Sequence, residues 1–396
     1  MEKEVLLKVE HLQQFFKMGR KELKAVNDVS FEIYKGEVFG LVGESGCGKT
    51  TTGRSIIRLY DITGGSVYYK GERICAGTRS YKDAIKVARA QFKKGLISEE
   101  EFKKIVDENR IEIKNAIKDH KKYSRTKVAD DNDPIKLAKE DLKSGKITKE
   151  KYDKLVSDYK TNNVMKNNKL TNEIQMIFQD PIASLDPRMT VRDIIAEGLI
   201  IRGIKDKEYI DQQVYKILDV VGLVQEHASR YPHEFSGGQR QRIGIARAIV
   251  MNPELIIADE PISALDVSIQ AQVINLLHEL SEKMGLTILF IAHDLAVVKY
   301  FSDRIAVMYY GKIVELATSE ELFKYPFHPY TKALLSAIPL PDPITEKNRK
   351  RTVYNPILDH DYSTEGPSMR EVYPGHFVYC NTEEFERFQK MYNESK

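Results

Sequence analysis

The chain has 396 residues, which suits one ordinary core with additions but not two large domains. A hydrophobic share of 42% provides for a packed interior, and a net charge of +3 is too small to indicate nucleic acid, so no specific nucleic-acid partner is expected. The three cysteines have no paired spacing, which excludes a disulfide framework and a Cys-x-x-Cys metal site and favours a reducing compartment, the cytoplasm.

The sequence offers no membrane-spanning segment. Its N-terminus lacks an apolar stretch of signal-peptide length, and no apolar run approaches the roughly 18 residues of a spanning helix. We therefore expect a soluble chain that reaches a membrane only by docking onto other subunits.

The segment 40–51 is the most informative, because residues 43–50 match the phosphate-loop pattern G-x-x-x-x-G-K-[ST]. A buried strand is predicted before the loop (37–42) and a helix after it (51–59). Glycines let backbone N–H groups turn toward phosphate oxygens, and the helix N-terminus adds its positive dipole. Lys49 is expected to reach the β- and γ-phosphates of ATP, and the Thr50 hydroxyl to bind Mg²⁺. The candidate nucleotide-binding residues are Gly43, Glu44, Ser45, Gly46, Cys47, Gly48, Lys49, Thr50 and Thr51.

Residues 78–172, after a strand predicted at 66–69, form a charged insertion. They hold 25 Lys and Arg against 16 Asp and Glu, a net charge of +9, which leaves −6 for the remainder of the chain. The pattern is helical, with few glycines, prolines and aromatics. It also repeats: Ala88, Lys93, Gly95, Ile97, Ser98, Glu100, Lys104 and Val106 recur fifty positions later as Ala138, Lys143, Gly145, Ile147, Thr148, Glu150, Lys154 and Val156.

Each copy of the repeat predicts two helices joined by a turn. A helix ends at the glycine, and Ser98 or Thr148 caps the next one, with Ser98 and Glu101 as a capping box. Three interpretations stay open: a solvated decoration, docking to a protein partner or permease, and contact with anionic lipid or RNA. The aromatics fall at helix-core spacing, which argues against base stacking.

A second apolar run, 255–258, ends in the acidic pair Asp259 and Glu260, the pattern of a central parallel strand. Asp259 is expected to hold Mg²⁺ through water, and Glu260 to orient and polarise the attacking water. Because side chains alternate along a strand, the two carboxylates are expected to point to opposite faces unless the strand ends there.

Further motifs resemble those of ABC ATPases in the family's order. Residues 235–242 are similar to the signature motif, with Phe235 at the usual Leu position, and precede a helix predicted at 243–251. They offer Ser236, Gly237, Gly238 and Gln239 as a second anion site, which the resemblance implies closes over the ATP of a partner subunit. It also implies a Q-loop metal contact at Gln179, a D-loop residue at Asp266, a switch histidine at His293 and an adenine-stacking ring at Phe16.

This resemblance implies an α/β P-loop fold: a RecA-like core with a mainly parallel sheet, an antiparallel β subdomain and a helical subdomain at about 191–230. The core is expected to occupy 1–77 and 173–325, with the inserted helical subdomain at 78–172 between its parts. Beyond it lies a C-terminal extension, 326–396, of irregular strands and turns wrapped on the core.

The segments 43–49, 178–188, 230–236, 328–335 and 374–380 are similar to the F-type ATPases of oligopeptide and dipeptide importers (the OppF type). That group implies ATP hydrolysis coupled to oligopeptide import at the cytoplasmic face of the membrane. Its partners would be a D-type ATPase subunit in a heterodimer, two membrane permeases and an extracellular peptide-binding protein. Some relatives carry a four-cysteine iron–sulfur site in the extension, but Cys380 is the only cysteine after Cys75, so no cluster is expected.

Three alternatives remain. A dipeptide or nickel importer of the same family is the nearest. A non-transport ABC ATPase would need two ATPase halves in one chain or a long coiled coil, and neither pattern is present. A module that holds ATP without hydrolysing it is disfavoured because Glu260 and His293 are both intact.

Overall fold

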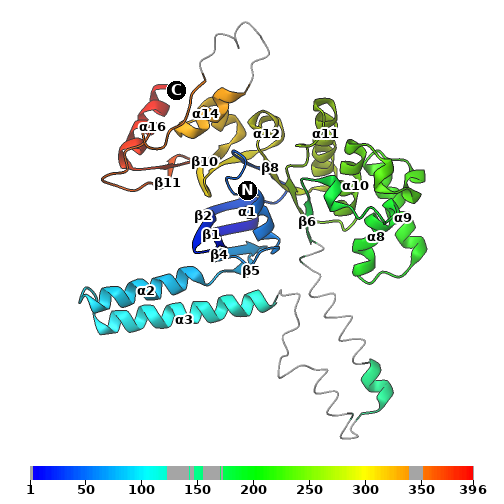
Figure 1. Cartoon of the computed structure of the whole chain (residues 1–396), viewed down its shortest axis with the longest axis horizontal. Coiled ribbons are helices and arrows are strands. Elements are labelled where there is room, and N and C mark those ends of the chain that lie inside the picture. Colours follow the sequence, from blue (N-terminus) through cyan, green and yellow to red (C-terminus); the bar gives the residue numbers. More distant parts are fainter. Residues whose placement is uncertain are drawn as a thin grey trace.

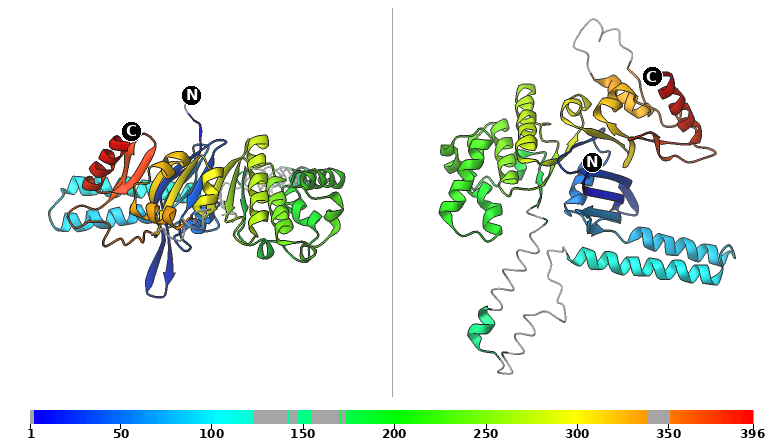
Figure 2. Two further views of the ribbon diagram at one scale, coloured as in Figure 1. Left: turned by 90° about the horizontal axis from the view of Figure 1, so that it is seen from above. Right: turned by 180° about the vertical axis from the view of Figure 1, so that it is seen from behind.

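The computed structural model describes residues 3–122, 142, 147–154, 170, 173–338 and 351–395, and these form an α/β fold with two sheets (Figure 1). The smaller sheet is antiparallel, as predicted, with the order β2-β1-β4-β5. Its strands are β1 (Val5–Met18), β2 (Lys21–Tyr34), β4 (Gly64–Tyr69) and β5 (Glu72–Ala76). The tip of the β1–β2 hairpin projects away from the rest of the molecule (Figure 2).

The larger sheet has the order β11-β12-β10-β9-β3-β8-β7-β6. The strands β9, β3, β8, β7 and β6 run parallel, so their carboxyl ends meet at one edge. The bounds are β3 (Val38–Val42), β6 (Ile174–Ile177), β7 (Leu255–Asp259), β8 (Thr287–Ala292), β9 (Arg304–Tyr309), β10 (Lys312–Thr318), β11 (Ser368–Tyr373) and β12 (His376–Cys380).

Both faces of the parallel strands are covered, which explains their continuous apolar runs. Phe39 and Leu41 of β3 pack toward the antiparallel sheet, while Val38 and Val42 pack toward the helices. The covering elements on that side include α8 (Val191–Ile201), α9 (Lys207–Val220), α10 (Gly237–Ile249), α11 (Val267–Met284), α12 (Leu295–Phe301) and α13 (Ser319–Lys324). The helical subdomain expected at about 191–230 is thus made of α8, α9 and the 3-10 turn Gln225–Ser229.

Two helix boundaries differ from the predicted ones. The helix after the phosphate loop, α1, spans Lys49–Ile56, so it starts inside the motif and is shorter than expected. The helix after the signature motif, α10, begins at Gly237 because Ser236 and Gln239 form a reciprocal capping box. Apolar periodicity located both helices but not their caps.

The C-terminal extension is more regular than predicted. It contains α14 (Pro329–Ala337), the β11–β12 hairpin and α16 (Thr382–Ser395). The expectation of irregular strands wrapped on the core was wrong, because β12 pairs with β10 and continues the central sheet. The unpaired edge of β10 would otherwise expose backbone donors and acceptors.

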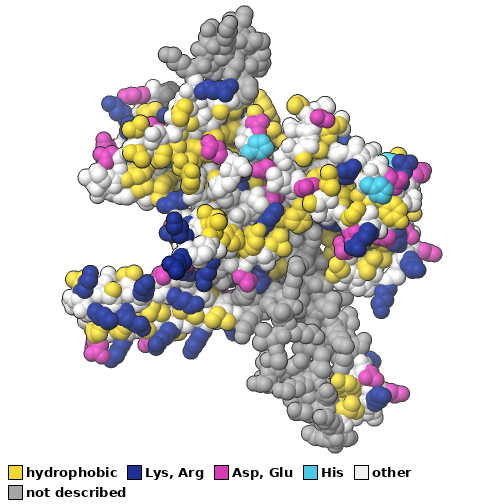
Figure 3. All heavy atoms as spheres, viewed as in Figure 1, with side chains coloured by type: hydrophobic (Ala, Val, Ile, Leu, Met, Phe, Trp, Pro, Cys, Tyr) yellow, Lys and Arg dark blue, Asp and Glu magenta, His cyan; other side chains and the backbone are white. Residues whose placement is uncertain are grey.

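Most of the described part of the insertion is a helical hairpin of α2 (Arg79–Lys93) and α3 (Glu99–Lys122), and a further short helix occupies residues 149–154. The predicted capping box is present: the Glu101 amide donates to Ser98 Oγ at 3.2 Å, and the Ser98 amide to Glu101 Oε2 at 2.9 Å. Lys and Arg dominate the face of the hairpin seen in Figure 3. In the second copy of the repeat, Ala138, Lys143, Gly145 and Val156 lie outside the described residues.

The hairpin is attached to β5 by charge pairs. Arg73 Nε donates to Asp119 at 2.8 Å, and its guanidinium lies 3.5 Å from Glu112. These contacts join α3 to the antiparallel sheet, whereas the phosphate loop follows a strand of the other sheet.

Replacing Tyr81–Lys169 with a short Gly-Ser linker is therefore expected to leave the Kd for MgATP within about twofold of wild type, as for insertions in surface connections. Isothermal titration calorimetry on the purified chain measures it, with Arg73→Ala as the control for loss of the attachment alone. A large loss of nucleotide affinity in the deletion, but not in the control, would show that the insertion belongs to the nucleotide-binding core.

Candidate functional site

The phosphate loop connects β3 to α1 and depends on glycine conformations. Gly43, Gly46 and Gly48 all have positive φ angles (150°, 83° and 110°), a region that side chains disfavour. A Cβ on Gly48 would lie 2.2 Å from the Ala25 carbonyl oxygen, so the β2 backbone closes tightly on the loop. The loop is thus a cradle of backbone N–H groups at a helix N-terminus, which fits a polyphosphate.

Lys49 lies inside this loop with 4% of its surface exposed. Its Nζ donates to the Gly43 carbonyl at 2.7 Å and to the Glu44 carbonyl at 3.0 Å. Cys47 Sγ lies 3.9 Å from the same ammonium group, and burial raises the pKa of its thiol. A buried, protonated thiol is a poor nucleophile, so the Cys47 thiol has no sign of reactivity here.

Thr50 at the start of α1 and Asp259 at the end of β7 form a hydrogen-bonded pair. The Thr50 hydroxyl donates to Asp259 Oδ1 at 2.7 Å, and the Arg54 guanidinium lies 3.8 Å from Oδ2. That second oxygen has no hydrogen-bond partner among the described residues, although Asp259 is fully buried. A hydroxyl beside a buried carboxylate with a spare oxygen fits Mg²⁺, which takes oxygen ligands. Gln179 contributes a third oxygen-bearing side chain nearby.

Glu260 connects the remaining polar groups. Gln179 Nε2 donates to Glu260 Oε2 at 3.1 Å, His293 Nδ1 lies 3.2 Å from the same oxygen, and Lys49 Nζ lies 3.9 Å from Oε1. Strand β7 ends at Asp259, and Glu260 takes a left-handed backbone (φ 45°). This turn breaks the alternation of the strand, so both carboxylates reach the phosphate loop instead of opposite faces.

The signature residues and Asp266 lie apart from this cluster. Ser236, Gly237, Gly238 and Gln239 start α10, and Asp266 precedes α11. Among the described residues, no hydrogen bond or ion pair joins them to the phosphate loop. A Cβ on Gly238 would lie 2.5 Å from the Ile269 side chain, so close packing on α11 requires this glycine.

Phe16 and Phe15 have different neighbours on β1. The Phe16 ring meets the Tyr60 ring edge to face at 5.3 Å, just beyond α1. The Phe15 ring faces the Arg79 guanidinium at 5.1 Å and the Lys24 ammonium at 5.6 Å. Phe15 is thus engaged by cations, and Phe16 remains the candidate for stacking on adenine.

One contact of the loop was missed at the sequence level. The Glu44 amide donates to the Tyr330 hydroxyl at 3.0 Å, across 286 residues of chain. The segment His328–Leu335 carries part of the resemblance to F-type ATPases, but no periodicity or motif spacing links it to the phosphate loop.

Comparisons with known proteins agree with this geometry. The sequence matches the ABC transporter family over residues 26–152 and 136–263, and the C-terminal region of oligopeptide/dipeptide transporters over residues 314–361. This chain belongs to the ABC transporter family of ATP-binding proteins. The two ABC matches overlap at residues 136–152, within the insertion.

Relatives of known name extend over nearly the whole chain. The chain is 49% identical to the oligopeptide transport ATP-binding protein OppF of Bacillus subtilis, covering 97% of this chain and 99% of that protein. It is 44% identical to AmiF of Streptococcus pneumoniae (98% and 99%) and 43% identical to the dipeptide transport ATP-binding protein DppF of Lactococcus lactis (97% and 97%). The predicted membership of the OppF-type group is confirmed.

Solved structures support the fold. A dimeric ATP-binding cassette in a post-hydrolysis state with ADP and Pi aligns with a TM-score of 0.51 at 22% identity, covering 79% of this chain and 99% of that one. CbiO1 of Clostridium perfringens aligns with a TM-score of 0.53 at 20% identity (81% and 91%). The predicted P-loop ABC ATPase fold is confirmed.

The buried charge of Asp259 gives the first prediction for the site. Burial raises the pKa of its carboxyl, against the opposing hydrogen bond from Thr50 and the charge of Arg54. Because the folded-state pKa is above the unfolded value, ionisation of Asp259 costs stability as pH rises from the unfolded pKa through the folded one. The nucleotide-free protein therefore carries more of this cost as pH rises above the unfolded-state pKa.

Asp259→Asn is expected to raise the Tm of the nucleotide-free protein at pH 7.5 while removing the Mg²⁺ dependence of ATP binding. The gain should shrink as pH falls toward the unfolded-state pKa of Asp, about 4, and vanish below it, where the carboxyl is protonated in both the folded and the unfolded state. Differential scanning fluorimetry across pH measures it, with Asp303→Asn as a control that removes a carboxylate from the other end of the sheet. A lower Tm for Asp259→Asn at pH 7.5 would contradict the argument.

Proposed function

We propose that this chain binds and hydrolyses MgATP to drive oligopeptide import, as a peripheral subunit of a membrane transporter. The observation that carries the proposal is the placement of Glu260. Its carboxylate contacts Gln179 and His293 and lies 3.9 Å from the phosphate-loop lysine, next to the Thr50–Asp259 pair. The names of the relatives at 43–49% identity supply the substrate class.

Each residue of the site has its own role in binding or hydrolysing ATP. Thr50, Asp259 and Gln179 would hold Mg²⁺, which would neutralise charge on the phosphates. Glu260 orients and polarises the attacking water, since the Gln179 amide and the His293 ring fix the direction of its carboxylate. His293 has 53% of its side chain exposed, so it stands at the open edge where the γ-phosphate arrives. The glycine loop and Lys49 bind the β- and γ-phosphates, and Phe16 stacks on adenine.

The site is completed by a partner subunit. Ser236 and Gly237 are exposed at the N-terminus of a thirteen-residue helix, where free N–H groups attract anions. They are not joined to this chain's own phosphate loop, so they serve the ATP of a D-type ATPase subunit in a heterodimer. Gln239 and the loop that contains Asp266 line the same contact between the two ATPase subunits.

The remaining partners are two membrane permeases and an extracellular peptide-binding protein, which places the chain at the cytoplasmic face of the membrane. No helix in the described part of the chain combines the length and apolarity needed to cross a bilayer. A dipeptide importer is the second candidate, because DppF of Lactococcus lactis is 43% identical. The peptide itself meets other subunits, so uptake by the whole transporter separates the two.

The test is ATP hydrolysis by the chain co-expressed with its neighbouring permease and ATPase subunits. Glu260→Gln should keep ATP binding and lose turnover by about 10²-fold or more, the usual share of a general base. The matched control is Glu254→Gln, which removes a carboxylate bound to Lys70 at the opposite end of β7. Unchanged turnover in Glu260→Gln would show that the partner's site carries the hydrolysis, and that this one acts only as a clamp.

A further inference from the structure

In the described part of the chain, the C-terminal extension contacts the phosphate loop through the side chain of Tyr330. Tyr330 lies in the first turn of α14, has 2% of its surface exposed, and accepts a hydrogen bond from the Glu44 amide at 3.0 Å. Glu44 is the second residue of the phosphate loop. We propose that Tyr330 is a positioning residue for ATP binding, which acts by fixing the peptide between Gly43 and Glu44. This inference rests on the proposed binding of ATP at the loop.

That peptide has a partner on each side. In a trans peptide the C=O and N–H groups point in opposite directions, so fixing one fixes the other. The Gly43 carbonyl accepts from Lys49 Nζ at 2.7 Å, and the Glu44 N–H donates to Tyr330. A rotation of the peptide would break both bonds and leave Lys49 with the Glu44 carbonyl as its remaining acceptor in the loop, so that the lysine is held less firmly where it meets the phosphates.

Gly43 cannot fix the orientation of the Gly43–Glu44 peptide by itself. Its φ of 150° lies where glycine is conformationally free, although the Met308 carbonyl oxygen would be 2.1 Å from an added Cβ. The β9 backbone therefore limits the space around Gly43, and the Tyr330 hydroxyl holds the N–H group of Glu44. Burial raises the pKa of this hydroxyl, so it stays protonated and neutral beside the loop.

Tyr330 is itself held from three directions. His328 caps α14, because its Nδ1 accepts from the Tyr330 amide at 3.1 Å. Burial and the neighbouring His360 lower the pKa of His328 to about 3, which keeps the ring neutral and able to accept. The Tyr330 ring packs on Tyr309 at 4.4 Å and on Tyr354 at 5.5 Å.

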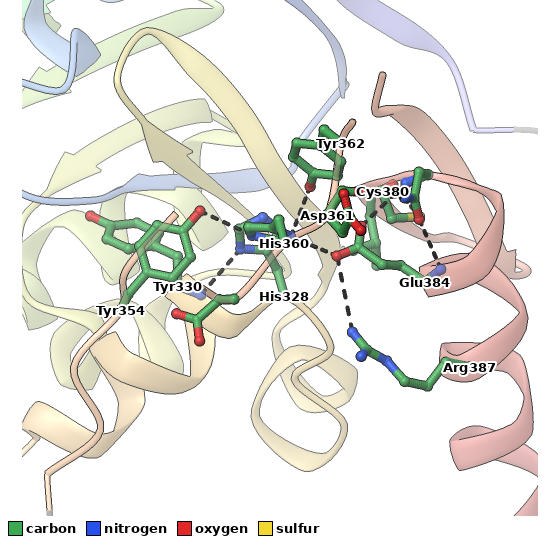
Figure 4. A network of polar contacts seen from close by, with 12 residues as sticks. His328, Tyr330, Tyr354, His360, Asp361, Tyr362, Cys380, Glu384 and Arg387 are labelled. Atoms are coloured by element: carbon green, nitrogen blue, oxygen red, sulfur yellow. Dashed lines mark hydrogen bonds and ion pairs between the residues drawn. The ribbon is translucent and has the colours of Figure 1, made fainter. Parts of the chain in front are cut away.

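The same cluster provides a matched control. The hydroxyl of Tyr354 lies 3.0 Å from His360 Nε2, and His360 Nδ1 lies 2.6 Å from Glu384 in α16 (Figure 4). Tyr354 and Tyr330 are neighbouring rings that each lose one buried hydrogen bond when changed to Phe. Only the Tyr330 bond ends on the phosphate loop.

The experiment compares Tyr330→Phe with Tyr354→Phe in the full chain, using calorimetry to measure the Kd for MgATP. Tyr330→Phe should weaken MgATP binding by about tenfold, the usual scale of one hydrogen bond, and Tyr354→Phe by less than about twofold. On a Lys49→Ala background, Tyr330→Phe should add no further loss, because it acts through that lysine. Equal Kd values for the two Phe variants, or additive losses with Lys49→Ala, would overturn the proposal.

Hydrogen exchange of the phosphate-loop peptide, without nucleotide, gives a readout that does not depend on binding. Tyr330→Phe should speed exchange there while Tyr354→Phe does not, and equal exchange would contradict the proposal. Thermal unfolding verifies that both variants are folded. If wild type itself fails to bind MgATP, the proposed function falls; if it binds and only the Tyr330 effect is absent, this inference alone falls.

Discussion

The buried carboxylate of Asp259 beside the Thr50 hydroxyl is the constraint on which the site depends. A charge removed from water needs compensation, and here one oxygen has a hydrogen bond while the other has only Arg54 at 3.8 Å. The carboxylate lies at this place because the parallel strands β3, β8, β7 and β6 end at one edge of the sheet. There the loop after β3 and the acidic end of β7 meet, which brings the buried carboxylate of Asp259 to the Thr50 hydroxyl.

Local signals predicted most of this arrangement. The glycine-lysine-threonine loop, the apolar strands and the capping box of Ser98 and Glu101 each depend on a few adjacent residues, and the structure has all of them. The direction of Glu260 was not predictable from alternation, because a left-handed residue ends the strand. This conformation brings Glu260 to the loop, to Gln179 and to His293, and it depends on neighbours from three other segments.

The extension was predicted least well because its order comes from contacts distant in sequence. Glu315 on β10 is fully buried and accepts hydrogen bonds from the Phe327 and His328 amides, while His376 Nε2 lies 2.7 Å away. A lone glutamate in a strand pattern gives no hint of these partners. The pairing of β12 with β10 likewise involves only an edge that the core leaves open.

The two additions to the core therefore differ in kind. The insertion joins β5 through the ion pairs of Arg73, and partly exposed ion pairs contribute little energy. The extension adds strands to the central sheet, and the side chains of Glu315 and Tyr330 are buried there. The Tyr330 hydroxyl also accepts a hydrogen bond from the Glu44 amide of the phosphate loop. A change in the extension can thus reach the phosphate loop through one peptide group, whereas the insertion touches the strand of the candidate adenine residue through the Arg79–Phe15 contact. On this basis we expect the extension to influence phosphate binding more than the insertion does.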